Sequence, residues 1–291
     1  MAEFSVKDIQ NLREKTGAGM MDCKKALAEA EGDMEKAVDI LRKKGAATAA
    51  KRADRDAKEG LIVSKVSADK KSAVLVEVNC ETDFVSRNEQ FGSFGDKVVS
   101  VALDTRPASL EALLSAQSAS IGNQTVSEFA TEMTGKTGEK VEVRRVAFVT
   151  VSNGLIVDYI HPGSKLGVLV ALETPGADNE KVATLGRDIA MQMAAANPLV
   201  LTRDKMDNTK IEAELSIYRT MALNEGKPEK IIDNIAKGKL EKFYKDFVLI
   251  EQEFVRDPAK TIKMVIDETA KELGIAIQVV HFERFLLGEN K

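Results

Sequence analysis

The sequence predicts an α+β protein with three parts: a helical module, a core of two similar sheet-and-helix halves, and an inserted antiparallel helical hairpin. Apolar residues recur at helical spacing over residues 5–44. Two later stretches, 60–103 and 146–196, each carry short apolar strands followed by a helix. Helical spacing returns over 207–246 on both sides of a turn. The 291 residues, 44% of them hydrophobic, suffice for a sizeable core and about two domains.

Residues 1–44 are expected to fold as three short amphipathic helices. Glycines at Gly17 and Gly32 mark helix ends, and Asp22 and Asp33 stand where helix starts favour an acidic cap. The pattern resembles ubiquitin-associated domains, so a compact three-helix domain of that type is predicted.

Residues 45–59 are predicted to form a linker that is helical in places. They include no aliphatic side chain larger than alanine, so they offer little to a packed core. Their basic residues are expected to face solvent rather than to bind RNA.

The core is predicted to contain a weak internal repeat. Its first half, residues 60–145, has a strand hairpin and then a helix; the expected ranges are 61–66, 73–78 and 88–103. Its second half begins at 146–206 and returns at 247–291; the expected strands are 146–151, 155–160, 167–172 and 275–285, and the expected helices are 178–196 and 259–273. Each half should form an antiparallel sheet covered on one face by helices.

Residues 207–246, between these parts of the second half, are predicted to form two antiparallel helices. Their apolar residues keep helical spacing on either side of the turn at 224–228. A hairpin inserted between a core helix and a returning strand is expected to project from the core.

The first motif is Thr-Asp-Phe-Val at residues 82–85, called the tip below. It follows a β-branched, apolar strand and sets a carboxylate beside a large aromatic ring where the chain should reach water. It predicts a projecting contact. The alternative is structural, with Asp83 capping the following helix and Phe84 packing back onto that helix.

The second motif occupies residues 12–27. A helix is expected to end at Gly17, a two-glycine turn follows, and Asp22 is expected to start the next helix. Met20 and Met21 then lie in the turn, where two adjacent large side chains cannot both face inward. One or both should therefore form a soft, exposed contact surface.

With both motifs at this separation, the chain resembles the bacterial elongation factor Ts family over essentially its whole length. The resemblance implies a translation factor that binds elongation factor Tu, both GDP-bound and nucleotide-free. It implies a nucleotide exchange factor, not an enzyme with bond chemistry of its own, that speeds GDP release and requires no cofactor. It also implies that GTP and then aminoacyl-tRNA load onto elongation factor Tu.

The resemblance further implies three groups of partner-binding residues. The tip acts as a wedge that disturbs the partner's Mg²⁺ site, with Phe84 supplying volume and Asp83 anchoring hydrogen bonds. The tip comprises Thr82, Asp83, Phe84 and Val85. An amino-terminal surface that supplies affinity comprises Arg13, Met20, Met21 and Lys24. A lever-arm surface for the partner's third domain comprises His161, Gly163, Phe254 and Val255. Arg256 follows where the family can carry an apolar residue, so the energetic share of this contact stays open.

Composition argues for a protein partner and against several other classes. The 42 basic and 46 acidic residues give a net charge of −4, which does not favour direct nucleic-acid binding. Cys23 and Cys80 lack the spacing of a disulfide framework or zinc site and are expected to be idle thiols. No stretch approaches the roughly 18 apolar residues of a membrane span, and the first ten residues are unlike a leader. A soluble, cytoplasmic protein is expected.

Two alternative functions rest on weaker signals. Residues 130–137 match a loose phosphate-loop pattern, but a helix is expected before them and a strand after, the inverse of a working loop.

His161 and His281 have no Ser, Cys or second His at a useful spacing, so no catalytic, metal or small-molecule substrate site is expected. His281 is expected to be structural and His161 exposed. The first alternative, a ubiquitin-associated-type adaptor, would explain only the first 45 residues or so. The second, a nucleotide hydrolase, can be tested because a hydrolase would itself bind GDP and an exchange factor would not.

Overall fold

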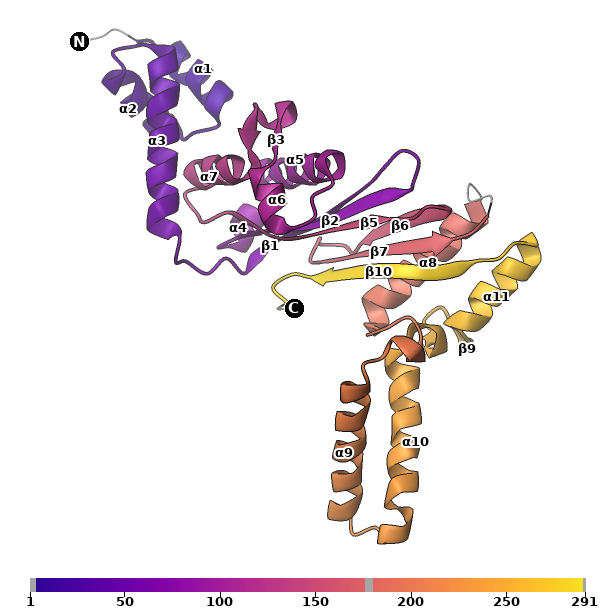
Figure 1. Ribbon diagram of the computed structural model, residues 1–291. Helices are drawn as coiled ribbons and strands as arrows, with labels where there is room; N and C mark the ends of the chain where they lie inside the picture. Colours follow the sequence, from indigo (N-terminus) through magenta and orange to yellow (C-terminus); the bar gives the residue numbers. More distant parts are fainter. Residues whose placement is uncertain (1–3, 176–179, 290–291) are drawn as a thin grey trace.

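The computed structural model describes residues 4–175 and 180–289 and has a mixed α+β fold with small antiparallel sheets (Figure 1). The α-helices are α1 (Val6–Thr16), α2 (Met20–Glu29), α3 (Met34–Arg52), α4 (Asp83–Ser86), α5 (Glu89–Thr105), α6 (Leu110–Ser115), α7 (Val126–Thr137), α8 (Glu180–Ala196), α9 (Asn208–Asn224), α10 (Glu229–Phe247) and α11 (Ile262–Leu273). The strands are β1 (Glu59–Val66), β2 (Ser72–Cys80), β3 (Gln117–Ser118), β4 (Gln124–Thr125), β5 (Glu142–Thr150), β6 (Gly154–Ile160), β7 (Leu166–Glu173), β8 (Glu253–Phe254), β9 (Asp257–Thr261) and β10 (Gln278–Leu286).

Helices α1, α2 and α3 form a module with its own small core around Leu12 and Leu27, both fully buried. A capping box at Ser5 starts α1, and Gly17 ends it in the left-handed conformation with a φ of 68°. Asp33 caps α3 by accepting hydrogen bonds from two backbone N–H groups. Local capping chemistry therefore sets the limits of these helices.

Helix α3 differs from the linker expected over 45–59, because it continues to Arg52. The alanine-rich sequence that lacks core-forming side chains also favours a helix. Small side chains let α3 approach α7 closely: a Cβ added at Gly135 would lie 2.6 Å from the Cα of Gly45. Arg52 also bonds Glu81 at 2.7 and 2.9 Å. The helical module is thus fixed to the first half of the core.

The first sheet has the strand order β1-β2-β5, all antiparallel. Helices α5, α6 and α7 lie over one face in Figure 1, and Phe91 and Phe94 fill the core beneath them. One correction concerns β5, whose residues from 146 onward were expected to begin the second half. Val146 pairs with Val76 of β2, so β5 completes the first sheet. Its apolar alternation predicts a strand but does not specify the strand's neighbour.

The second sheet has the strand order β10-β7-β6, with the late strand β10 supplying the third member. Helices α8 and α11 contribute to its core. The two sheets meet through buried apolar side chains that include Ile62, Leu75, Leu169 and Phe285. The expected start of α8 at 178 lies outside the described residues, and the expected helix at 259–273 begins only at Ile262, after β9.

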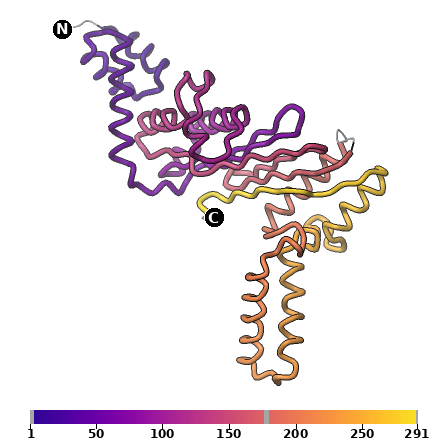
Figure 2. The backbone as a smooth tube through the Cα atoms, viewed as in Figure 1, coloured from indigo at the N-terminus to yellow at the C-terminus, as the bar shows by residue number. Residues whose placement is uncertain are grey.

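Helices α9 and α10 form the expected antiparallel hairpin, which extends away from both sheets (Figure 2). A cluster of apolar side chains that includes Phe243 and Val248 closes its base. Arg203 strengthens the base through ion pairs with Glu241 at 2.8 Å and Glu251 at 2.5 Å.

Candidate functional site

The tip projects from the end of β2. After Cys80 the chain stays extended at Thr82, with φ −125° and ψ 157°, and then makes the single turn of α4. Phe84 in that turn is 84% exposed, the highest fraction among the large apolar side chains that the structure describes. The structural alternative for this motif is therefore wrong: Phe84 does not pack onto α5. Asn88 caps α5, accepting from the Gln90 N–H at 2.8 Å, in place of Asp83.

Contacts with the rest of the first half hold the tip in place. Glu139 accepts hydrogen bonds from the Thr82 N–H at 3.0 Å and the Thr82 hydroxyl at 2.7 Å. Asp83 forms an ion pair with Arg87 at 3.0 Å, and Val85 packs against the first core. Of the four tip residues, only Phe84 has a largely exposed side chain. The contacts of the other three hold the turn that carries it.

The thiol of Cys80 lies beneath the tip and donates to the Thr82 carbonyl at 3.2 Å. Burial, with a further contribution from the negative charge of Glu139, raises the pKa of Cys80 to about 12. Cys80 is therefore a neutral packing residue, as the sequence suggests.

Leaving a phenylalanine exposed forgoes about 1.5 to 3 kcal/mol of burial energy, which favours a role for Phe84 in contact with a partner.

The helix that carries most of the amino-terminal surface begins two residues earlier than expected. Helix α2 starts at Met20, not at Asp22, because Gly19 takes the extended cap position and Asp22 pairs with Lys44 of α3. Met20 is 44% exposed and Met21 is 63% exposed, so both methionines face solvent from the first helical turn.

Arg13 and Lys24 are also exposed on the amino-terminal surface, on α1 and α2. An open groove of about 670 Å³ lies between this module and the first half of the core, and Arg13, Met20, Gln90 and Lys136 line it. Gln90 belongs to the first turn of α5, which follows the tip directly. The groove therefore lies between the amino-terminal surface and the first turn of α5.

The lever-arm surface is divided. His161 and Gly163 are exposed in the turn between β6 and β7, and His161 Nδ1 lies 2.9 Å from the Tyr159 hydroxyl. Gly163 has a φ of 89°, a conformation that favours glycine. This turn is joined to β1, because the Ile62 N–H donates to the Ser164 carbonyl at 2.6 Å.

The other two lever-arm residues lie beside α8. Phe254 is only 7% exposed and packs in the second core, so it supports this surface from inside. Val255 is 48% exposed, and its N–H donates to Gln192 Oε1 of α8 at 2.8 Å. Arg256 forms an ion pair with Asp188 at 2.5 Å, which fastens this turn to α8. The sequence alone does not predict this ion pair, because Asp188 and Arg256 lie 68 residues apart and no local pattern connects them.

Residues 130–137 form part of α7 and cannot form a phosphate loop. Their backbone N–H groups are used within the helix, and Gly138 ends it. Glu132 hydrogen-bonds Gln124 at 2.7 Å and pairs with Lys136 at 2.6 Å. Burial alone would raise the pKa of Glu132, but these two contacts outweigh it and lower the pKa.

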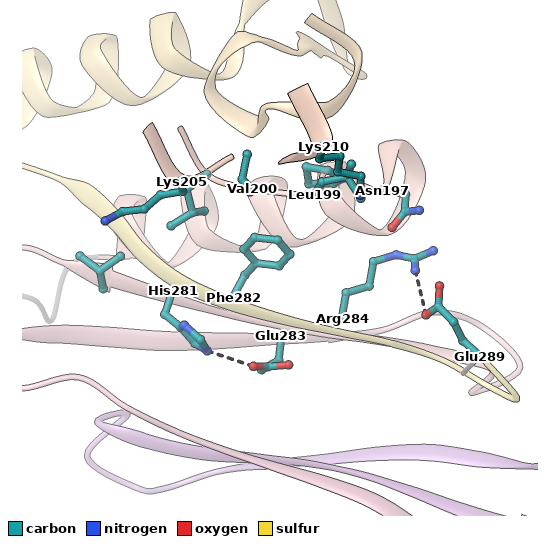
Figure 3. A pocket seen from close by; sticks show the side chains of 13 residues that line it. Asn197, Leu199, Val200, Lys205, Lys210, His281, Phe282, Glu283, Arg284 and Glu289 are labelled. Atoms are coloured by element: carbon teal, nitrogen blue, oxygen red, sulfur yellow. Dashed lines mark hydrogen bonds and ion pairs between the residues drawn. The ribbon is translucent and has the colours of Figure 1, made fainter. Parts of the chain in front are cut away.

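His281 lies at the edge of a groove of about 720 Å³ between β10 and residues 197–201 (Figure 3). Its Nε2 is 3.2 Å from Glu283, and it is exposed. Phe282 and Arg284 point toward the groove, whereas His281 and Glu283 point away from it. Within residues 4–175 and 180–289, no cluster of three or more His, Cys, Asp or Glu side chains could hold a metal ion. No helix in these ranges is long and apolar enough to cross a membrane.

Comparison with known proteins gives a consistent result. The family model described as "Elongation factor TS" matches residues 81–289. A protein named elongation factor Ts from Chloroherpeton thalassium is 49% identical, and the match covers all of both chains. Proteins of the same name from Prosthecochloris aestuarii and Clostridium botulinum are 46% and 47% identical over 99% of this chain, covering 100% and 94% of their own lengths.

Proposed function

Because this chain belongs to the elongation factor Ts family, we propose that it is a guanine nucleotide exchange factor for elongation factor Tu in the cytoplasm. It binds elongation factor Tu with GDP, speeds GDP release, and leaves when GTP loads. It makes or breaks no covalent bond. Nucleic acid, membrane and a small-molecule substrate are not its direct partners.

The observation that carries the proposal is the exposure of Phe84 on a fixed turn. A projecting aromatic with rigid support can enter a gap in a partner without first losing conformational entropy of its own backbone. In the proposed complex, the tip lodges in the nucleotide domain and displaces the elements that hold Mg²⁺ at the diphosphate. Because the metal neutralises the phosphates, its loss weakens the neighbouring contacts with GDP.

The exchange follows from thermodynamic linkage. By whatever factor this protein lowers the partner's affinity for GDP, GDP lowers the partner's affinity for this protein by the same factor. The ternary complex is therefore a short-lived intermediate that either ligand can leave. A tip that binds through one aromatic side chain is suited to such a complex. Its contact is strong only while the partner's Mg²⁺-holding elements stay displaced.

The other surfaces supply affinity in this proposal. Arg13, Met20, Met21 and Lys24 grip another face of the nucleotide domain, and their module is of the ubiquitin-associated type. His161, Gly163 and Val255 hold the partner's third domain, with Phe254 packed behind Val255. The two halves of the core represent a duplicated unit, each half presenting one contact region.

Stopped-flow release of fluorescent GDP from elongation factor Tu tests the proposal. Release should accelerate with added protein up to a plateau, and the protein alone should bind no GDP. GDP binding by this chain would favour a nucleotide hydrolase. No acceleration, together with peptide binding by the first three helices, would favour a ubiquitin-associated-type adaptor.

A further inference from the structure

The junction between the two sheets contains a buried ion pair. Glu77 on β2 is fully buried, on the opposite face of the strand from the core beneath α5. Arg145 of β5 donates from Nε to Glu77 Oε2 at 2.5 Å, and the Arg144 guanidinium lies 3.7 Å from Oε1. A charged pair at this depth requires a compensating set of hydrogen bonds, because both ions lose their water.

The end of β10 and the residues after it supply one such hydrogen bond to each ion. The Gly288 N–H donates to Glu77 Oε1 at 2.9 Å, and Arg145 Nη2 donates to the Leu286 carbonyl at 2.7 Å. The Arg145 guanidinium also lies over the ring of Phe285, 4.1 Å from its centre. Glu77, Arg145 and residues 285–288 form a connected group, which we name the clasp.

The clasp also reaches the turn between β6 and β7. The Leu287 N–H donates to the Lys165 carbonyl at 2.8 Å, and Lys165 Nζ pairs with Glu59 of β1 at 2.8 Å. One short segment at the end of β10 thus bonds the strand that leads to the tip and the turn that carries His161 and Gly163.

We propose that Glu77 and Arg145 are positioning residues that fix the orientation of the tip relative to the lever-arm surface. This inference rests on the proposed exchange function. Glu77 lies three residues before the end of β2, and the tip follows that end directly. The tip can displace part of its partner only if the tip itself does not move when the partner resists. The clasp connects the tip to the lever-arm surface, which holds the partner's third domain in the proposed complex. A buried ion pair adds little net stability compared with apolar side chains of similar size, so orientation is its main contribution.

The test replaces both charges, with Glu77→Met and Arg145→Met in one protein, so that neither ion of the pair is left without the other. The Arg144 side chain, which also faces Glu77, is 27% exposed and keeps its access to water. A second variant ends the chain after Leu286, which removes the N–H donors of Leu287 and Gly288 and keeps β10. The matched control is Arg203→Met: Arg203 likewise pairs with glutamates and stacks on a ring, 4.3 Å from the centre of Tyr244, but within the hairpin base.

The first readout is the distance between spin labels on the two halves, measured without any partner. Cysteines introduced at Asp96 of α5 and Met264 of α11, both exposed, carry the labels, whereas Cys23 and Cys80 are buried. Both clasp variants should broaden or shift the distance distribution, and the Arg203→Met control should not. An unchanged distribution in the clasp variants would overturn the inference, whether or not the protein accelerates GDP release.

The second readout is GDP release from elongation factor Tu, divided into the rate at saturation and the half-saturating concentration. Because small misplacements of a positioned group reduce rates strongly, both clasp variants should lower the saturated rate by about tenfold or more. The half-saturating concentration should change far less, and the control should match the unaltered protein. Broadened distances with a normal saturated rate would also overturn the inference. Failure of the unaltered protein to release GDP would instead refute the exchange function.

Discussion

Replacing Gly135 with alanine should force apart two helices that touch through glycine. A Cβ at Gly135 would lie 2.6 Å from the Cα of Gly45, whereas a Cβ at Gly45 would lie 3.5 Å from the Cα of Gly135. Ordinary contact begins at 3.4 Å, so the Gly135→Ala variant must move backbone by about 0.8 Å, the difference between 3.4 and 2.6 Å. Gly45→Ala requires no movement and is the matched control.

The two variants separate packing from helix propensity. Each gains about 1 kcal/mol from replacing glycine inside a helix. Only Gly135→Ala also suffers overpacking, which typically costs about 1 to 3 kcal/mol. The free energy of unfolding of Gly135→Ala should therefore be lower than that of Gly45→Ala by about 1 to 3 kcal/mol. In a protein of this size, each kcal/mol changes the melting temperature by about 2 to 4 °C.

Calorimetry on both variants checks this difference. GDP release supplies a second readout, since moving α3 displaces the amino-terminal surface relative to the tip and should raise the half-saturating concentration for Gly135→Ala only. Equal melting temperatures for the two variants would refute the close helix crossing and with it the fixed placement of the amino-terminal module.

Three further predictions concern separate parts of the chain. Serine at both Met20 and Met21 should raise the half-saturating concentration about fivefold or more and leave the saturated release rate unchanged. The control Met264→Ser, at another exposed methionine, should change neither quantity. A reduced saturated rate in the Met20 and Met21 variant would contradict an affinity role. A Gly/Ser link in place of residues 215–237 should leave GDP release within about twofold, because the projecting hairpin is remote from the tip; loss of release with a normal circular dichroism spectrum would show that the hairpin contacts the partner. Burial alone would raise the pKa of Glu81, but hydrogen bonds from the Lys140 N–H and Arg52 outweigh it and lower the pKa from its ordinary value. Glu81 therefore stabilises the fold above its ordinary pKa and ceases to do so as the pH falls through the lowered pKa. Glu81→Gln should flatten the acid-side decline of melting temperature, and parallel declines of the two proteins would contradict this.

Local sequence patterns predict much of this fold. The apolar run at 73–76 in β2 marks a buried strand, and the helical spacing around the turn at 224–228 predicts the projecting hairpin. Phe84 could be identified as a projecting residue because an aromatic beside an aspartate follows a buried strand, where the chain must turn into water.

Contacts between distant segments account for what the sequence did not predict. β5 was assigned to the wrong half because alternation does not identify the neighbouring strand. Glu139 supports Thr82 across 57 residues, and no short pattern connects them. Phe254 was expected on a surface but is buried, since an apolar residue before an exposed valine suits either place. The glycines at 45 and 135 have meaning only once α3 and α7 are known to cross.

The central claim is that Phe84 acts in a partner and not in its own fold. Because Phe84 is 84% exposed, Phe84→Ala should leave the melting temperature nearly unchanged, and Leu223→Ala, at another exposed apolar position, serves as the control. Removing an aromatic from the centre of an interface costs on the order of 2 to 4 kcal/mol, a loss of roughly 30-fold or more. Asp83→Asn should act in the same direction but more mildly.

The most direct measurement records GDP release from elongation factor Tu and the melting temperature on one preparation of Phe84→Ala. We predict a fall in GDP release of roughly 30-fold or more with an unchanged melting temperature, while Leu223→Ala matches the unaltered protein in both. A Phe84→Ala protein that melts several degrees lower yet releases GDP at the normal rate per folded molecule would contradict the account.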